Sequence, residues 1–223
     1  ESDRVAIEEL LTGADMVFIT AGMGGGTGTG AAPVIASIAK ELGALTVAVV
    51  TKPFKFEGKK RIAAAEKGLA ALVEEVDSLV TIPNEKLLEI LGPDTPISDA
   101  FAKSDDVLKG AVQGISDIIM QRGHVNVDFA DVRAVMSEKG TAMMGTGIAT
   151  GKNRAEVAAT MAVKSELLDD INLKNARGIL VNITGRSPTL GDQTEVTNIV
   201  EEIVSEDALV IYGLVFDDSY KDD

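Results

Sequence analysis

Residues 45–51 (LTVAVVT) form an almost purely apolar run that is rich in β-branched side chains. This composition is typical of a strand that is buried on both faces, as in a parallel sheet covered by helices. We predict two further strands at 15–20 and 77–82, separated from the first by helices at 31–42 and 58–75. The order strand, helix, strand, helix, strand predicts an α/β fold with a doubly wound, Rossmann-like parallel sheet.

The helix at 31–42 is expected to have Pro33 near its first turn and to be ended by Gly43. Residues 96–123 keep helical spacing of apolar residues and predict one long helix. The pattern then predicts a second α/β unit, with helices at 129–138, 153–164 and 194–205 and strands at 141–149, 178–184 and 208–216. The chain is therefore expected to divide into a first lobe (1–95), a central helix (96–123) and a C-terminal lobe (124–223).

The two ends of the sequence suggest an internal fragment. The first residues read as part of a helix that leads directly into a strand. The last residues read as a strand without a following element, which is expected to leave a sheet edge exposed.

Charge and composition exclude several classes of partner. The net charge of −14 argues against binding to nucleic acid or to anionic membrane surfaces. No apolar run approaches the ~20 residues of a membrane helix, so no direct membrane insertion is expected. The absence of cysteine excludes disulfides and thiolate metal sites, and a cytoplasmic protein is the natural expectation.

The stretch AGMGGGTGTGAAP (21–33) lies between the first predicted strand and the first predicted helix. Clustered backbone N–H groups at the positive end of a helix form a physically sound phosphate site. The lysine of a Walker loop is missing, and the dinucleotide pattern fails because no acidic residue ends the following strand. A glycine-rich turn that allows close packing of helix and sheet is the alternative, and the spacing leaves both open.

Five motifs, in order along the chain, carry a resemblance to a known family. They are AGMGGGTGTGAAPV, TKPFKFEGKKR (51–61), TIPNEKLL (81–88), DDVLKGAVQGI (105–115) and NVDFADVRAVM (126–136). Together they resemble the FtsZ family, the bacterial tubulin-like cell-division GTPases, over essentially the whole chain. The resemblance implies a tubulin/FtsZ-like fold, with a partial GTP-binding lobe, the central helix, and a truncated C-terminal lobe that carries a catalytic acid loop.

The resemblance also implies which residues bind GTP or GDP, with Mg²⁺ bound through the nucleotide and no metal held directly by the protein. Glu57 and Arg61 would lie at the ribose and phosphates, although an ordinary i,i+4 ion pair is the alternative. Phe101 would stack on guanine and Asp105, with Asp106 able to share the role, would bind its edge; core packing and a solvated helix face are the alternatives. The implied phosphate loop comprises Gly24, Gly25, Gly26, Thr27, Gly28, Thr29 and Gly30, with Gly26, Thr27 and Gly28 closest to the nucleotide.

Asp128 and Asp131 lie three residues apart at a predicted helix start. Local physics explains them as an N-cap and an acid that interacts favourably with the helix dipole. The resemblance implies instead that their loop enters the nucleotide site of the neighbouring subunit, where both acids position the attacking water. Asn126 would contact the same nucleotide.

The implied function is a GTP-hydrolysing cytoskeletal protein that polymerises head to tail into filaments of the division ring at mid-cell. Other division proteins would bind through a C-terminal tail for which the sequence has no counterpart. The family's first strand and its glycine-rich loop also have no counterpart before Glu1, so the isolated chain is expected to bind GTP weakly and to be inactive. A glycine-loop binding module without hydrolysis, or a fragment that caps filaments, is the alternative function.

Overall fold

The computed structural model describes residues 3–120, 127–138, 140–168 and 173–220. The chain forms two compact units that alternate along the sequence. Unit 1 comprises Glu1–Val112 and Met136–Met143, and unit 2 comprises Gln113–Val135 and Met144–Asp223. Within the described ranges, no helix is both long and apolar enough to cross a membrane.

Unit 1 is built on a parallel sheet with the strand order β1-β2-β3-β4. Its three long strands are β1 (Met16–Gly22), β2 (Leu45–Lys52) and β3 (Ser78–Pro83). β2 is buried at every position except Lys52, which is what its apolar composition predicts. Because the three strands run parallel, their carboxyl ends meet at one edge of the sheet.

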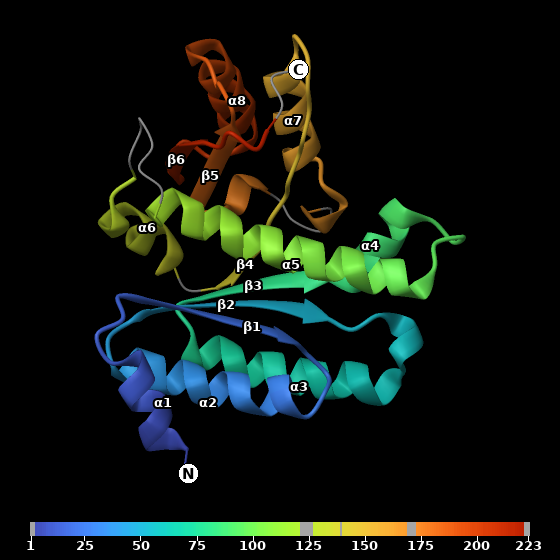
Figure 1. Ribbon diagram of the computed structural model, residues 1–223, viewed down its shortest axis with the longest axis vertical. Helices are drawn as coiled ribbons and strands as arrows, with labels where there is room; N and C mark the ends of the chain where they lie inside the picture. Colours follow the sequence, from blue (N-terminus) through green and yellow to red (C-terminus); the bar gives the residue numbers. More distant parts are fainter. Residues whose placement is uncertain (1–2, 121–126, 139, 169–172, 221–223) are drawn as a thin grey trace. The chain divides into compact units, whose positions relative to one another are not determined.

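Helices cover both faces of the unit 1 sheet (Figure 1). α2 (Thr27–Glu41) and α3 (Lys59–Glu75) lie side by side on one face, and the first part of α5 (Ile97–Met120) lies on the other. The predicted order of strands and helices is thereby confirmed. Small and aliphatic side chains fill the core below the sheet, among them Ala36, Ala39, Ala48, Val50 and Leu72. The remaining helices of the unit are α1 (Arg4–Leu11), the short 3-10 helix η1 (Lys55–Glu57) and α4 (Asn84–Leu91).

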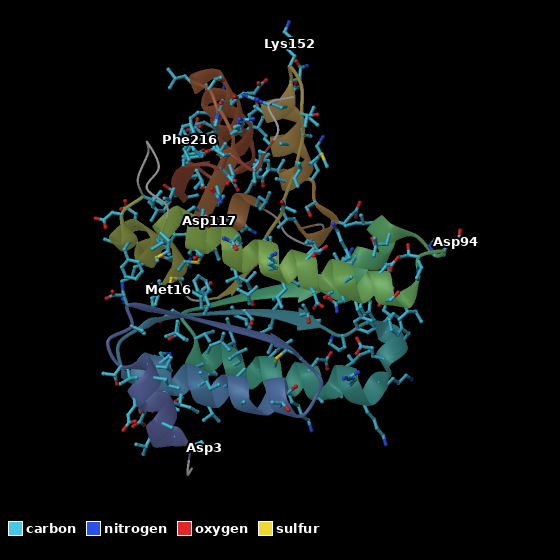
Figure 2. All side chains as sticks on the ribbon, in the orientation of Figure 1. Asp3, Met16, Asp94, Asp117, Lys152 and Phe216 are labelled. Carbon is cyan, nitrogen blue, oxygen red and sulfur yellow. The ribbon has the colours of Figure 1, made fainter. Side chains whose placement is uncertain are left out.

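Unit 2 contains a parallel pair of strands, β5 (Gly178–Gly185) and β6 (Leu209–Phe216). Two helices, α7 (Arg154–Val163) and α8 (Leu190–Ile203), pack on one face of this pair around Ala155, Ala159, Val196 and Val200. The loop that turns back into α7 carries Lys152, whose side chain points away from the unit, and Phe216 marks the end of β6 (Figure 2).

The opposite face of the β5–β6 pair meets the last part of α5. There the side-chain amide of Asn182 donates to the backbone carbonyl of Gly114 over 3.2 Å. Unit 2 also contains α6 (Phe129–Met136, of which Met136 belongs to unit 1) and the 3-10 helices η2 (Glu166–Leu168) and η3 (Leu173–Asn175).

The prediction of a strand at 141–149 is wrong for most of this range. In the described part of the chain, pairing with β3 is limited to Thr141 and Ala142, which form β4. The chain then lies directly on α7. A Cβ at Gly145 would collide with the carbonyl oxygen of Ala162, and one at Gly147 would collide with that of Ala158. The small residues therefore serve close packing on a helix, and the alternating apolar pattern does not produce a longer strand.

Helix boundaries differ from the prediction at two informative places. α2 begins at Thr27 and takes Pro33 into its interior, so part of the glycine stretch is helical. α8 begins at Leu190 because Thr189 caps it: the Thr189 hydroxyl accepts from the Asp192 N–H and the Asp192 carboxylate accepts from the Thr189 N–H. The helix predicted at 129–138 ends at Met136, and the last residues of the one predicted at 96–123 lie outside the described residues.

Candidate functional site

The glycine stretch connects the carboxyl end of β1 to the first turn of α2. Gly24 has a φ of +102°, a conformation that residues with a side chain rarely adopt. A Cβ at this position would also lie 2.7 Å from the carbonyl oxygen of Arg61. The Gly24 N–H donates to the hydroxyl oxygen of Thr29 over 2.8 Å. The backbone at Gly24 is therefore held between the first turn of α2 and the start of α3.

The other glycines of the stretch divide into two kinds. A Cβ at Gly28 would lie 3.0 Å from both Ala21 Cβ and the carbonyl oxygen of Gly22, so this residue packs helix against strand. At Gly25, Gly26 and Gly30 an added Cβ would meet none of the described residues within 4 Å. The close-packing interpretation therefore holds for Gly28, whereas Gly25, Gly26 and Gly30 have no such packing partner and remain candidates for phosphate binding.

The start of α2 has backbone donors available for an anion. The first N–H groups of a helix have no acceptor inside the helix. Gly26 precedes the helix and, among the described residues, no side chain caps this end. Gly26 and Thr27 are exposed. A phosphate group placed here would receive several N–H donors and the favourable end of the helix dipole.

Glu57 and Arg61 lie where η1 leads into α3. One carboxylate oxygen of Glu57 accepts from the Phe54 N–H and the other accepts from Nη1 of Arg61, both over 2.9 Å. The Glu57 side chain is 11% exposed, whereas that of Arg61 is 52% exposed. The i,i+4 ion pair considered from the sequence therefore exists. The accessible guanidinium of Arg61 keeps donors available for a ligand.

Three phenylalanines form an aromatic cluster beside this ion pair. The rings of Phe54 and Phe56 are stacked with centroids 4.9 Å apart, and Phe101 of α5 meets both edge-on at 5.2 Å and 6.0 Å. Phe54 is fully buried, but Phe101 is 40% exposed. Phe101 is thus anchored by the cluster and still presents part of its ring to solvent.

Asp105 and Asp106 are both exposed on α5. Asp105 lies one helical turn after Phe101, which places the two side chains on the same side of the helix. The intervening Ser104 is buried and donates to the side-chain oxygen of Asn84 over 2.7 Å. This buried hydrogen bond fixes α5 against α4 between the two exposed residues.

A continuous series of contacts therefore links the glycine loop to α5. Gly24 lies against Arg61, Arg61 pairs with Glu57, Glu57 holds the backbone of Phe54, and Phe54 packs against Phe101. All of these residues belong to unit 1. Unit 1 thus brings together the candidate phosphate, ribose and base residues that the sequence scattered over 24–105.

The candidate catalytic acids, Asp128 and Asp131, belong to unit 2. The Asp128 carbonyl accepts from the N–H groups of Asp131 and Val132, and its carboxylate accepts from the Ala130 N–H over 3.3 Å. Asp128 therefore does begin α6, as the local interpretation predicted. The Asp131 side chain is exposed in the first turn, and Asn126 lies outside the described residues.

Two features of the site were missed from the sequence. Thr29 holds Gly24 through its hydroxyl, although the motif suggested only a phosphate contact. Gly68 of α3 is buried, and a Cβ there would collide with the Thr29 methyl group. A lone glycine inside a helical pattern was the available signal for this close packing.

Comparisons with known proteins cover both units. Residues 1–92 match the family model described as Tubulin/FtsZ family, GTPase domain, and residues 140–223 match that described as FtsZ family, C-terminal domain. The cell division protein FtsZ of Pseudomonas aeruginosa is 62% identical over 222 residues, which are 99% of this chain and 56% of that protein. That of Coxiella burnetii is 57% identical over 224 residues, 100% of this chain and 58% of that protein. The chain thus spans little more than half the length of these relatives.

Solved structures agree with these matches. An FtsZ dimer from M. jannaschii superimposes with a TM-score of 0.94 at 45% identity, covering 99% of this chain and 64% of that chain. CetZ from Methanosaeta thermophila superimposes with a TM-score of 0.77 at 18% identity over 99% of this chain and 63% of that chain, which shows a shared fold.

Proposed function

The chain belongs to the FtsZ family, as its motifs predicted, and on that premise we propose that it is part of a GTPase that polymerises head to tail. In this proposal residues 1–95 are part of the nucleotide-binding lobe, 96–123 the central helix and 124–223 a truncated lobe with the acid loop. The observation that carries this proposal is the series of contacts from Gly24 to Phe101 at the carboxyl ends of the parallel strands. Ligands of doubly wound sheets bind at this edge.

Each part of GTP has a candidate residue in this series. The open N–H groups around Gly25, Gly26 and Thr27 receive phosphate oxygens, and the exposed guanidinium of Arg61 adds a positive charge. Glu57, whose carboxylate is fixed by two hydrogen bonds, is the candidate residue for the ribose. Phe101 offers a ring for stacking and Asp105 a carboxylate for the donors on the guanine edge, which adenine lacks.

In this proposal Mg²⁺ is bound through the phosphates of the nucleotide. Over the described ranges, no group of three or more histidine, aspartate or glutamate side chains could hold a metal ion. When bound to the phosphates, Mg²⁺ neutralises part of their charge.

In this proposal, Asp128 and Asp131 of one subunit complete the active site of the neighbouring subunit. Phosphoryl transfer depends on positioning and charge stabilisation more than on covalent chemistry by the protein. Asp131 is exposed in the first turn of α6 and is suited to orient the attacking water. Asp128 fixes that helix start, and Asn126 contacts the same nucleotide.

A shared active site implies the mode of assembly. One subunit offers its nucleotide face and the next offers its acid loop, so the interface is heterologous and does not close. Filaments of this kind form the division ring at mid-cell in the cytoplasm, where other division proteins join them. The names of the relatives, cell division proteins, support this role, and one solved relative is described as a dimer.

The deciding experiment uses the full-length protein that carries this chain. We expect light scattering to rise on addition of GTP, to fall as phosphate is released, and to stay low with GDP or ATP. GTP binding without scattering or phosphate release would favour the alternative, a nucleotide-binding module without hydrolysis. A protein that binds no GTP at all would overturn both.

A further inference from the structure

Both the hydroxyl and the methyl group of the Thr29 side chain contact other parts of the protein. Its hydroxyl oxygen accepts the Gly24 N–H over 2.8 Å, and its methyl group faces α3 at Gly68. Gly68 is buried, and a Cβ there would collide with this methyl group and lie 2.7 Å from the terminal methyl of Met23. The first turn of α2 and the middle of α3 therefore pack together only because Gly68 has no side chain.

From this geometry we infer that Thr29 is a positioning residue of the nucleotide loop and that Gly68 selects its rotamer. The inference rests on the proposed function, because it concerns the loop that receives the phosphates. It changes the expected role of Thr29 from a ligand of the phosphates to the residue that holds Gly24. It also assigns a role to Gly68, which lies outside the motifs that pointed to the site.

The coupling arises because the hydroxyl and the methyl group are bonded to the same Cβ. A rotation that moves the methyl group away from α3 also moves the hydroxyl away from Gly24. In helices threonine has a second favourable rotamer, in which the hydroxyl bonds a carbonyl three or four residues earlier. For Thr29 those carbonyls belong to Gly26 and Gly25. A side chain at position 68 would thus transfer the hydroxyl from Gly24 to the helix backbone.

Release of Gly24 matters because its backbone sets the direction of the following residues. Gly24 has a φ of +102° and lies on the Arg61 carbonyl, and the open N–H groups of Gly25 and Gly26 come next. Donors that bind an anion need a fixed direction, and the supporting contacts maintain it. The Thr29 hydroxyl holds this backbone through a side-chain hydrogen bond, so its loss lowers nucleotide affinity without removing a phosphate ligand.

The test uses four variants of the full-length protein: Thr29→Val, Thr29→Ser, Gly68→Ala, and Gly68→Ala combined with Thr29→Ser. Valine keeps the methyl group and loses the hydroxyl, and serine does the reverse. Gly110→Ala is the matched control for Gly68→Ala, because an added Cβ at Gly110 in α5 would meet no described atom within 4 Å. Thr194→Val in α8 is the matched control for Thr29→Val, since it also removes a hydroxyl bonded to the backbone.

Two measurements are made on each protein: GTP affinity by titration, and hydrogen exchange of the Gly24 amide without nucleotide. We expect Thr29→Val and Gly68→Ala each to weaken GTP binding about tenfold or more and to accelerate exchange at Gly24. Thr29→Ser should keep the Gly24 amide protected. Adding Thr29→Ser to Gly68→Ala should restore most of the lost affinity, because it removes the colliding methyl group.

Recovery of affinity in the double variant would show that Gly68→Ala acts through the position of the Thr29 side chain. A general loss of structure in Gly68→Ala would not be repaired by adding Thr29→Ser. Wild-type affinity and exchange in Thr29→Val would overturn the inference, and so would a double variant no better than Gly68→Ala. If Gly68→Ala does not fold, Thr29→Val still decides. If the wild-type protein binds no GTP, the proposed function fails, and the Gly24 exchange rates still show whether Thr29 positions the loop.

Discussion

The ring of Phe101 meets the buried ring of Phe54 edge-on, with the two centroids 5.2 Å apart and the planes at 87°. The contact joins the start of α5 to the segment that carries Glu57 and Arg61. It anchors the Phe101 ring, which is still partly exposed. An exposed aromatic ring is a surface on which a base can stack.

Phe101→Ala should therefore weaken GTP binding about tenfold, since base stacking contributes about 1–3 kcal/mol. The loss of folding stability should be smaller, because the side chain is partly exposed. Titration with GTP and urea denaturation measure the two effects. Phe216→Ala is the control, since Phe216 is 39% exposed and lies in unit 2. Unchanged affinity in Phe101→Ala, or an equal loss in both variants, would contradict a stacking role.

Asp105 is expected to select guanine. Asp105→Ala should reduce the preference for GTP over ATP, because loss of a polar partner costs about 1–3 kcal/mol. Competition titrations with both nucleotides measure this preference. Asp106→Ala tests whether the neighbouring exposed acid shares the role. If the preference survives in both variants, the assignment of the base site to this part of α5 is wrong.

Asp131 is expected to act on the nucleotide of the next subunit. Asp131→Asn should preserve folding and GTP binding and reduce turnover by a large factor, since a neutral amide lacks the negative charge that orients and polarises the attacking water. Asp128→Asn should retain part of the capping of α6 and also reduce turnover. Phosphate release and circular dichroism measure the two properties.

Mixing of two inactive proteins distinguishes action within a subunit from action across subunits. One protein carries Asp131→Asn, and the other has an intact acid loop but substitutions at Gly26 and Gly28. Hydrolysis should recover at mixed contacts. No recovery at any ratio, although both proteins are folded and assemble together, would leave the shared site without support.

Acid should weaken the connection between α7 and α8. Two hydrogen bonds from the Arg154 guanidinium, followed by those from Thr189, lower the pKa of Asp192 from 3.8 to about 2. Because the pKa of Asp192 is lower in the folded state than in the unfolded state, its ionised carboxylate stabilises the folded state. This stabilisation is complete above the unfolded-state pKa and is lost as the pH falls from about 4 toward 2. Asp192→Asn should cost about 1–2 kcal/mol at pH 7 and only a small part of that near pH 2, where the carboxyl is about half protonated in the folded state.

Urea denaturation of the wild-type and variant proteins between pH 7 and pH 2 measures this difference. Glu195→Gln, which alters an exposed acid of the same helix, is the control and should show no such pH dependence. A difference between wild type and Asp192→Asn that stays constant over this range would refute the ion pair as its source.

The sequence was sufficient for the architecture where composition and periodicity agreed. β2 is apolar throughout and buried on both faces, and the two long helices beside it follow their periodicity. The predicted tubulin/FtsZ-like fold, with parallel-sheet α/β lobes and a long central helix, is confirmed by the match to solved FtsZ structures. The prediction was weaker at 141–149, where Gly145 and Gly147 pack on α7 carbonyls that no local pattern reveals.

In the candidate site, too, some features could be predicted from the sequence and others could not. A motif identified the glycine loop, but it could not distinguish Gly28, which packs against Ala21, from Gly25 and Gly26, which face open space. The ion pair between Arg154 and Asp192 joins residues far apart in the sequence and has no local signature. Tertiary packing decides such features, and a single sequence does not record it.

The alternation of the two units along the chain affects how the protein is made. β4 pairs with β3, yet it is synthesised only after the residues of unit 2 that lie between Gln113 and Val135. During synthesis, Leu79 and Val80 of β3 therefore lack their partners in β4 until Thr141 and Ala142 have left the ribosome. Unpaired strand edges favour association with other chains. A chaperone that covers this part of β3 during translation should raise the yield of folded protein more than the same chaperone added after release.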